Sequence, residues 1–302
     1  QAQNFPSRPV RIIVPFVPGA AADALARTIA NALSTEWGQP VIVENRPGGN
    51  TVIGTELVVN SPPDGHTLLF TSDDTYTSLS YLMRNLPFDP IKDLTPVNIP
   101  AKVTMLIVAH SSTPVDNLQS LISQARAKPA SLSYGSYGAG SNPHLMMETL
   151  KSQAKVDILH VPYKGVAQAQ AAVVAGEVQL AVTGYGTAKG MIDAGRLKPI
   201  AVTGPERIPQ LPNLPTTAEL GYPDVDSTVW WGFAAPAKTP ADIVNKINTS
   251  ITRAVNSPEL RKALETRALV PLNLGPKAAA ERIASEHTSR AQVVSRSGAK
   301  LD

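Results

Sequence analysis

The stretch VRIIVPFVPGAAADALARTIANALSTEWG, residues 10–38, decides the fold. Residues 10–15 form a short, β-branched apolar run that ends at a proline and is soon followed by Pro18-Gly19, which predicts a buried strand and then a turn. Across residues 21–38 the apolar residues recur at helical spacing, and a glycine closes the segment. A strand, a glycine turn and a helix in succession make a βα unit.

The same alternation continues along the chain. Apolar, β-branched runs bounded by Gly and Pro predict strands, and segments with helical spacing lie between them. The further strands are expected at residues 40–44, 67–71, 103–109, 132–134, 158–161, 178–183, 199–202 and 229–235. The further helices are expected at residues 52–59, 113–127, 143–152, 166–175, 188–194 and 216–220, from 239 onward, and from 276 into the 290s. This order predicts an α/β fold with a mainly parallel sheet.

The length of 302 residues suggests two domains. The βα rhythm stalls between residues 77 and 100, where an irregular connection is expected, and a second series begins at residue 103. The strand at residues 229–235 is expected to cross back to the first domain. We therefore expect one lobe made of residues 1–102 and 227–302, and another made of residues 103–226.

Composition excludes several classes of protein. Lys and Arg number 27 against 24 Asp and Glu, a net charge of +3, which is no nucleic-acid-binding excess. Cysteine is absent, so disulfides, thiolate nucleophiles, Cys-ligated zinc and iron–sulfur clusters are excluded. No apolar run approaches the ~20 residues that cross a bilayer, so no membrane insertion is expected. The first residue is Gln1, which fits cleavage after a signal peptide and equally a trimmed chain.

Two loops have the composition of an anion site built from backbone amides. Residues 18–23 (PGAAAD) lead into a helix and carry only tiny side chains before the acid, so an anion could approach the N–H groups closely. Residues 135–143 (GSYGAGSNP) form a Gly-rich, hydroxyl-rich loop with Asn142 as the expected N-cap and Pro143 at the first helical position. The alternative is that both are ordinary βα turns in which glycine relieves steric conflict.

Asp23 beside the first loop would repel an anionic ligand. Its place in the first helical turn predicts a structural role, bonding the loop and complementing the helix dipole. Other lining candidates follow predicted strands, at the strand ends where ligands gather in open α/β sheets. The full set of candidate binding residues is Phe16, Pro18, Gly19, Ala20, Ala21, Ala22, Ser136, Tyr137, Gly138, Ala139, Gly140, Ser141, His144, Lys164, Gly165, Thr183, Gly184 and Tyr185.

Enzyme signatures are missing from the sequence. Neither Gly-rich segment matches a phosphate loop or a dinucleotide fingerprint, and the five histidines lack metal-ligand spacing, so no cofactor and no metal are expected. Two alternatives stay open at this point. One is a hydrolase with Ser136 or Ser141 as nucleophile and His144 as base. The other is a ligand sensor that acts through a partner protein.

Eight motifs, in order, resemble the tripartite tricarboxylate transporter receptor family, the Bug-type periplasmic solute-binding proteins. They are residues 14–23, 44–49, 63–68, 86–90, 135–145, 160–165, 214–216 and 236–240. The resemblance implies a two-lobed, type II periplasmic-binding-protein-like fold with a hinged interdomain cleft. It also implies a periplasmic, monomeric, non-catalytic receptor that closes on a small carboxylate and delivers it to membrane permease subunits.

Two departures from the family pattern bear on the ligand. Ala20 stands where the family has a second glycine, and residues 183–186 (TGYG) replace the acidic or amide residue that relatives often carry. Small side chains at residues 20–22 leave room for a bulky solute, and Tyr137 and Tyr185 could stack on a ring. We expect a dicarboxylate, with an aromatic one such as terephthalate slightly favoured over an aliphatic one such as adipate.

Overall fold

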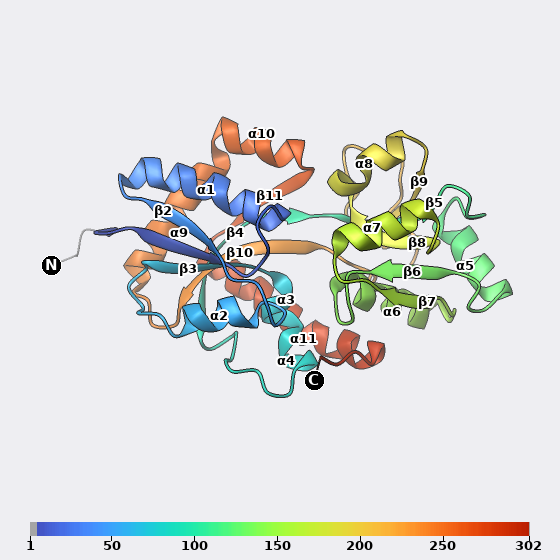
Figure 1. Ribbon diagram of the computed structural model, residues 1–302, viewed down its shortest axis with the longest axis horizontal. Coiled ribbons are helices and arrows are strands. Elements are labelled where there is room, and N and C mark those ends of the chain that lie inside the picture. Colours follow the sequence, from blue (N-terminus) through green and yellow to red (C-terminus); the bar gives the residue numbers. More distant parts are fainter. Residues whose placement is uncertain (1–4, 302) are drawn as a thin grey trace. The chain divides into compact units, whose positions relative to one another are not determined.

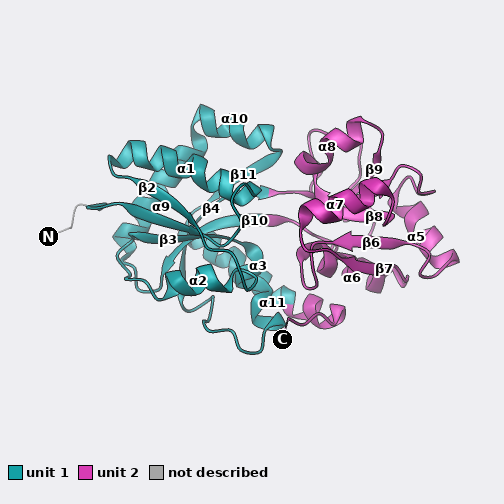
Figure 2. Ribbon diagram, viewed as in Figure 1, with its two compact units in different colours: residues 1–102, 230–290 teal, residues 103–229, 291–302 magenta. Residues whose placement is uncertain are grey.

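The computed structural model describes residues 5–301 and divides the chain into two compact units. Unit 1 contains residues 1–102 and 230–290, and unit 2 contains residues 103–229 and 291–302 (Figure 2). The sequence placed residues 227–302 in the first lobe as one piece. In the structure residues 227–229 and 291–302 group with unit 2.

Unit 1 is built on a six-stranded sheet with the order β11-β4-β10-β3-β1-β2 (Figure 1). Its strands are β1 (Val10–Val14), β2 (Val41–Asn45), β3 (Thr67–Ser72), β4 (Leu94–Val103), β10 (Val229–Pro236) and β11 (Leu269–Leu274). β1 pairs in parallel with β2 and β3, and β10 pairs antiparallel with β3. The carboxyl ends of β1, β2 and β3 therefore share one edge of the sheet.

The helices of unit 1 include some that the sequence predicted and some that it did not. They are α1 (Ala21–Trp37), α2 (Val52–Val59), α3 (Asp73–Thr77), α4 (Leu79–Leu82), α9 (Ala241–Asn256), α10 (Pro258–Thr266) and α11 (Pro276–Ser297), the last of which continues past the boundary of the unit. The helix α1 buries its apolar stripe against β2 and α9 and ends at Gly38, which takes the left-handed conformation that glycine tolerates best.

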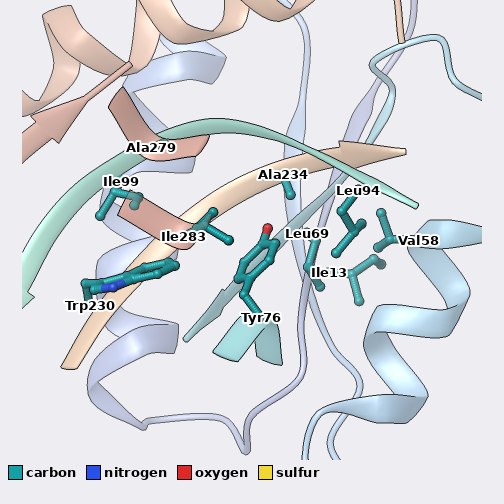
Figure 3. Packing of buried hydrophobic residues seen from close by; sticks show 10 residues of the cluster. All are labelled: Ile13, Val58, Leu69, Tyr76, Leu94, Ile99, Trp230, Ala234, Ala279 and Ile283. Carbon is teal, nitrogen blue, oxygen red and sulfur yellow. The ribbon is translucent and has the colours of Figure 1, made fainter. Parts of the chain in front are cut away.

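One hydrophobic cluster in the core of unit 1 contains ten buried side chains, contributed by both the sheet and the helices (Figure 3). Figure 3 shows the ring of Tyr76 among side chains from the strands and from α11, with Trp230 nearby. The Tyr76 and Trp230 rings lie with centroids 5.9 Å apart, and both residues are buried. This burial fixes β3, β10 and α11 together beneath the loops at the sheet edge.

Unit 2 is built on a five-stranded sheet with the order β7-β6-β8-β5-β9. Its strands are β5 (Met105–His110), β6 (Ser133–Ser136), β7 (Leu159–Pro162), β8 (Leu180–Gly184) and β9 (Leu197–Val202). Its helices are α5 (Leu118–Ala127), α6 (Asn142–Ala154), α7 (Val166–Ala175) and α8 (Tyr185–Asp193). β6 runs parallel to β7 and β8, whereas β5 is antiparallel to β8 and β9. Both sheets are thus mixed, which corrects the expectation of a mainly parallel sheet.

Several further expectations about local structure are corrected. The irregular connection expected between residues 77 and 100 is found at residues 83–93, but α4 and most of β4 occupy much of the rest of that range. The helix expected from residue 113 begins only at Leu118, because Asn117 and Ser120 form a reciprocal capping box there. Residues 216–220 form a turn rather than a helix, and α10 and β11 lie between the two long helices at the end of the chain.

Candidate functional site

Asp23, in the first turn of α1, ties the first candidate loop to the neighbouring strand. Its carboxylate accepts hydrogen bonds from the Gly19 N–H at 2.9 Å and from Arg27 Nε at 3.1 Å. It also accepts one from Asn45 Nδ2 at 2.9 Å, and Asn45, at the end of β2, donates in addition to the Phe16 carbonyl at 3.0 Å. Asp23 is only 3% exposed. The predicted structural role of Asp23 is therefore confirmed.

The charge state of Asp23 follows from the same contacts. Burial on its own raises the pKa of this carboxyl, but the hydrogen bonds from Gly19, Arg27 and Asn45 outweigh it and hold the pKa below its usual value. Asp23 is therefore ionised at neutral pH. One part of the sequence prediction is corrected here, because the Gly19 N–H is used by Asp23 and is not offered to a solute.

The donors that remain in the first loop belong to the start of α1. Ala20 is the N-cap, and its methyl side chain makes no capping hydrogen bond. The N–H groups of the next three residues have no acceptor within the helix, as in any helix start. The side chains of Ala20, Ala21 and Ala22 at this helix start are small, and Pro18 and Gly19 before them are exposed. Unit 1 thus presents an uncapped helix N-terminus at the carboxyl edge of its sheet.

The second candidate loop, in unit 2, connects β6 to α6 and is held by its own hydrogen bonds. Gly138 and Gly140 have φ of +133° and +77°, conformations that glycine adopts without strain. The Gly138 carbonyl accepts from Ser141 Oγ at 2.6 Å, and the Gly138 N–H donates to Ser136 Oγ at 3.2 Å. Ala139 at the tip is exposed, and Tyr137 is half-buried.

The start of α6 differs from the prediction by one residue. Ser141, not Asn142, is the N-cap, because Ser141 has an extended backbone and Asn142 is already helical. Pro143 consequently sits at the second helical position. Asn142 is buried, and its Oδ1 accepts a hydrogen bond from Ser227 Oγ at 3.0 Å. The side chain of Asn142 therefore anchors the residue 227 segment within unit 2 instead of capping the helix.

Two histidines lie against the second loop. His144, 7% exposed, accepts a hydrogen bond from the Gly140 N–H on Nδ1 at 3.0 Å. His160, on β7, pairs through Nε2 with Ser136 Oγ at 2.6 Å. Burial lowers the pKa of both rings, and that of His160, further depressed by His144, falls to about 4. Sequence reasoning did not include His160 among the candidate residues, although it begins the motif at residues 160–165 and lies near the end of a predicted strand.

The remaining lining candidates share an edge with the second loop. Because β6, β7 and β8 are parallel, their carboxyl ends coincide, and the Tyr163 N–H after β7 donates to the Ser136 carbonyl at 2.8 Å. Gly165 and Gly184 are the N-caps of α7 and α8, without side-chain capping bonds. Lys164 is exposed, whereas Tyr185 is 8% exposed. Of the sequence-predicted residues, those of unit 2 are thus brought to one sheet edge, and those of unit 1 to another.

Thr183, at the end of β8, is 5% exposed, and within residues 5–301 its hydroxyl has no hydrogen-bond partner. Across the same residues, no group of His, Asp and Glu side chains is arranged to hold a metal ion. None of the described helices combines the length and the apolar character needed to cross a membrane.

Comparison with known proteins identifies the family. Residues 25–298 match the model described as the tripartite tricarboxylate transporter family receptor. The chain belongs to this family. Protein BugT of Bordetella pertussis is 33% identical over 301 residues, covering 99% of this chain and 92% of BugT.

Two solved structures of similar proteins contain a bound solute. R. palustris Rpa4515 with adipate is 34% identical, with a TM-score of 0.87 over 98% of this receptor and 100% of that chain. MatC from Rhodopseudomonas palustris with bound malate is 30% identical, with a TM-score of 0.82 over 96% of this receptor and 100% of that chain. The resemblance predicted from the motifs is confirmed, and so is the two-lobed α/β fold of periplasmic binding proteins.

The receptor is a solute-binding protein and not an enzyme, as the family shows. The geometry does not provide the serine and histidine roles of the hydrolase alternative. Ser136 pairs with His160 rather than with His144, and its complete burial closes it to a substrate. Ser141 Oγ donates to a backbone carbonyl. The expected base, His144, accepts from a backbone N–H and contacts neither serine through a hydrogen bond among the described residues.

Proposed function

We propose that this receptor captures a small dicarboxylate in the periplasm and delivers it to the membrane permease subunits of a tripartite tricarboxylate transporter. The family establishes a solute-binding receptor of the TctC and Bug type. The class of solute is supported by the two relatives described with adipate and with malate, since both of these are dicarboxylates.

The single observation that carries the carboxylate assignment is the uncapped start of α1. Three backbone N–H groups there lack acceptors within the helix, and the helix dipole favours an anion. The side chains of Ala20, Ala21 and Ala22 are methyl groups, and the charge of Asp23 is paired with Arg27 and hydrogen-bonded by Gly19 and Asn45. No Lys or Arg occurs in residues 15–22 or 135–143. Binding would therefore draw on fixed amide dipoles rather than on ion pairs, and added salt should weaken it little.

The second loop is proposed to contribute through fewer donors than its sequence suggests. The N–H groups of Gly138, Gly140 and Ser141 already bond within unit 2. The backbone N–H groups of the exposed Ala139 and of the start of α6 are the donors that could still bind a carboxylate. We propose that loops of both units bind the same solute, with the lobes closing over it and Lys164, Gly165, Thr183, Gly184 and Tyr185 as further lining.

One observation supports an aromatic group between the two carboxylates of the solute, and another supports an aliphatic group. The half-buried ring of Tyr137 supports an aromatic body such as terephthalate. The relative described with adipate supports an aliphatic body. The nearly complete burial of Tyr185 leaves that ring little surface for stacking. We propose the dicarboxylate class, with terephthalate and adipate as its two representatives.

The test is calorimetric titration of protein that has been unfolded, dialysed free of solute and refolded. Terephthalate, adipate and malate are the titrants, and matched monocarboxylates are the controls. At least one dicarboxylate should bind more tightly than its monocarboxylate, and its affinity should change little between low and high salt. Binding of none of them would remove the proposal. Small-angle scattering with the bound titrant tests closure and a monomeric state, and uptake by vesicles that contain the permease tests delivery.

A further inference from the structure

A stacked pair of histidines supports the Gly-rich loop of unit 2. The ring of His144, from α6, lies parallel to the ring of His160, from β7, with centroids 3.9 Å apart and an interplanar angle of 7°. Each ring bonds a different part of the loop through one nitrogen. The two contacts define which nitrogens carry protons.

The proton of His144 is placed by the contact with Gly140. The Gly140 N–H can only donate, so Nδ1 of His144, 3.0 Å away, must present a lone pair. A neutral His144 therefore carries its proton on Nε2. A protonated His144 would turn a donor toward this N–H and break the contact.

The proton of His160 follows from counting lone pairs on the Gly138 carbonyl oxygen. Three donors lie within reach of that oxygen: Ser141 Oγ at 2.6 Å, the Ser141 N–H at 3.2 Å and Ser136 Oγ at 3.0 Å. A carbonyl has two lone pairs, and Ser141 supplies two donors. The Ser136 hydroxyl is then free to donate to His160 Nε2 at 2.6 Å while it accepts from the Gly138 N–H. The arrangement that gives every donor a lone pair of its own therefore leaves Nε2 of His160 unprotonated as well.

The charged and titratable groups around the pair come from α6 and β6. The Tyr134 ring, on β6, stacks on His160 with centroids 5.0 Å apart, and its hydroxyl donates to Glu148 Oε1 at 2.8 Å. Lys151 Nζ lies 2.8 Å from the same oxygen, so the carboxylate of Glu148 is already paired. No unbalanced negative charge remains there to stabilise an imidazolium.

We propose that His144 and His160 are positioning residues that hold residues 136–141 in the solute-binding shape, and that they do so only as neutral rings. The proposal rests on the proposed function in one respect, namely that this loop contacts the solute. Protonation of His144 places donor against donor at the Gly140 N–H and releases that attachment of the loop. Protonation of His160 reverses its hydrogen bond and turns the Ser136 hydroxyl back toward the Gly138 carbonyl, which already accepts from both donors of Ser141. The receptor would then lose its solute in strongly acidic medium while keeping it at neutral pH.

The decisive experiment uses solute-free protein and two readouts. Long-range ¹H–¹⁵N NMR of the imidazole rings reports which nitrogens are protonated. Amide hydrogen exchange of residues 138–141, corrected for intrinsic rates, reports the loop. At pH 7 we expect Nδ1 of His144 and Nε2 of His160 to be unprotonated. We expect the hydrogen-exchange protection of the loop to stay constant through mild acid and to be lost as the rings protonate.

Paired variants separate positioning from mere packing. His144→Asn keeps an acceptor near the Nδ1 position and His160→Gln keeps one near Nε2, whereas the leucine variants keep only bulk. Each leucine variant should lower the hydrogen-exchange protection of the loop about tenfold, which corresponds to the loss of one hydrogen bond. The amide variants should restore this protection and should keep it in acid, because Asn and Gln side chains do not protonate. His110→Leu, elsewhere in unit 2, is the matched control and should leave the loop unchanged.

Several results would overturn the proposal. Imidazolium rings at pH 7, or the opposite tautomer on either histidine, would contradict it even if no variant folds. Loop protection that survives both leucine variants, or that the amide variants fail to restore, would do so as well. A final titration with adipate, malate and terephthalate separates the two claims. If none of these binds unaltered protein, the proposed function fails, and the exchange and NMR results still decide the role of the rings.

Discussion

Replacing Gly138 tests whether the backbone of the second loop is required in its observed form. The φ of Gly138 is +133°, a conformation that L side chains rarely adopt. Space at the Cβ position is no obstacle, because within residues 5–301, apart from the chain neighbours of Gly138, the only atom within 4 Å of an added Cβ is the Tyr163 carbonyl oxygen, at 4.0 Å. The cost of Gly138→Val is therefore conformational, about 1–3 kcal/mol for a non-glycine residue held in such a region.

The loop can meet that cost in two ways. If residues 136–141 keep their shape, the free energy of unfolding falls by the full strain. If the loop relaxes, the contacts of Gly138 with Ser136 and Ser141 are lost, at about 1 kcal/mol each. In both cases we expect a loss of about 1–3 kcal/mol in urea unfolding, with weaker solute binding by calorimetry.

Gly190 provides the matched control. It lies inside α8 with an ordinary φ, and no atom stands within 4 Å of an added Cβ. Gly190→Ala should raise the free energy of unfolding by about 0.5–1 kcal/mol, because alanine is the better helix former. A Gly138→Val protein as stable as the unaltered chain, with the same affinity for solute, would refute the assignment of this loop.

Three further predictions concern ion pairs and pH. Arg290→Met should lower the free energy of unfolding by about 1–3 kcal/mol at pH 7, because it removes the cation that faces the fully buried Asp73, whose pKa burial and Asp74 raise. Arg282→Met removes a more exposed pair and should cost less, at most about 1 kcal/mol, and a larger loss in urea unfolding for Arg282→Met than for Arg290→Met would contradict this. Asp23→Ala should cost about 2 kcal/mol and speed hydrogen exchange of the Gly19 amide, and unchanged exchange would show that this contact does not hold the loop. The pKa of His160 is about 4 in the folded chain against 6.5 unfolded, so its contribution is complete above pH 7 and falls by up to about 3 kcal/mol as the pH drops to 4; His160→Gln should remove this slope, and an identical pH profile for the variant would contradict the depressed pKa.

Local signals predicted the opening of the chain well. The apolar period of residues 21–37 and the glycine after them define α1 without help from the rest of the molecule. β4 was missed for the opposite reason. Pro96 and Pro100 interrupt its apolar run, and the strand is stabilised by lying between β10 and β11, which are far away in sequence.

The candidate loops were located from sequence, but their chemistry was only partly predicted. Composition shows where amides lie near small side chains, and it predicted the structural role of Asp23. It could not show that Asp23 itself occupies the Gly19 amide, nor that His144 occupies that of Gly140. His160 was missed because its partner, Ser136, lies 24 residues away and is reached only once β6 and β7 pair.

The claim that matters most is that a carboxylate binds to backbone amides of both loops. Its most direct test is a ¹H–¹⁵N NMR titration of solute-free protein with terephthalate, adipate and malate, following every assigned backbone amide. We predict that the dicarboxylate that binds will shift the amides of residues 20–23, 137–142 and 144 most strongly. Binding that leaves either set of amides unmoved, or binding of none of the three solutes, would contradict the account.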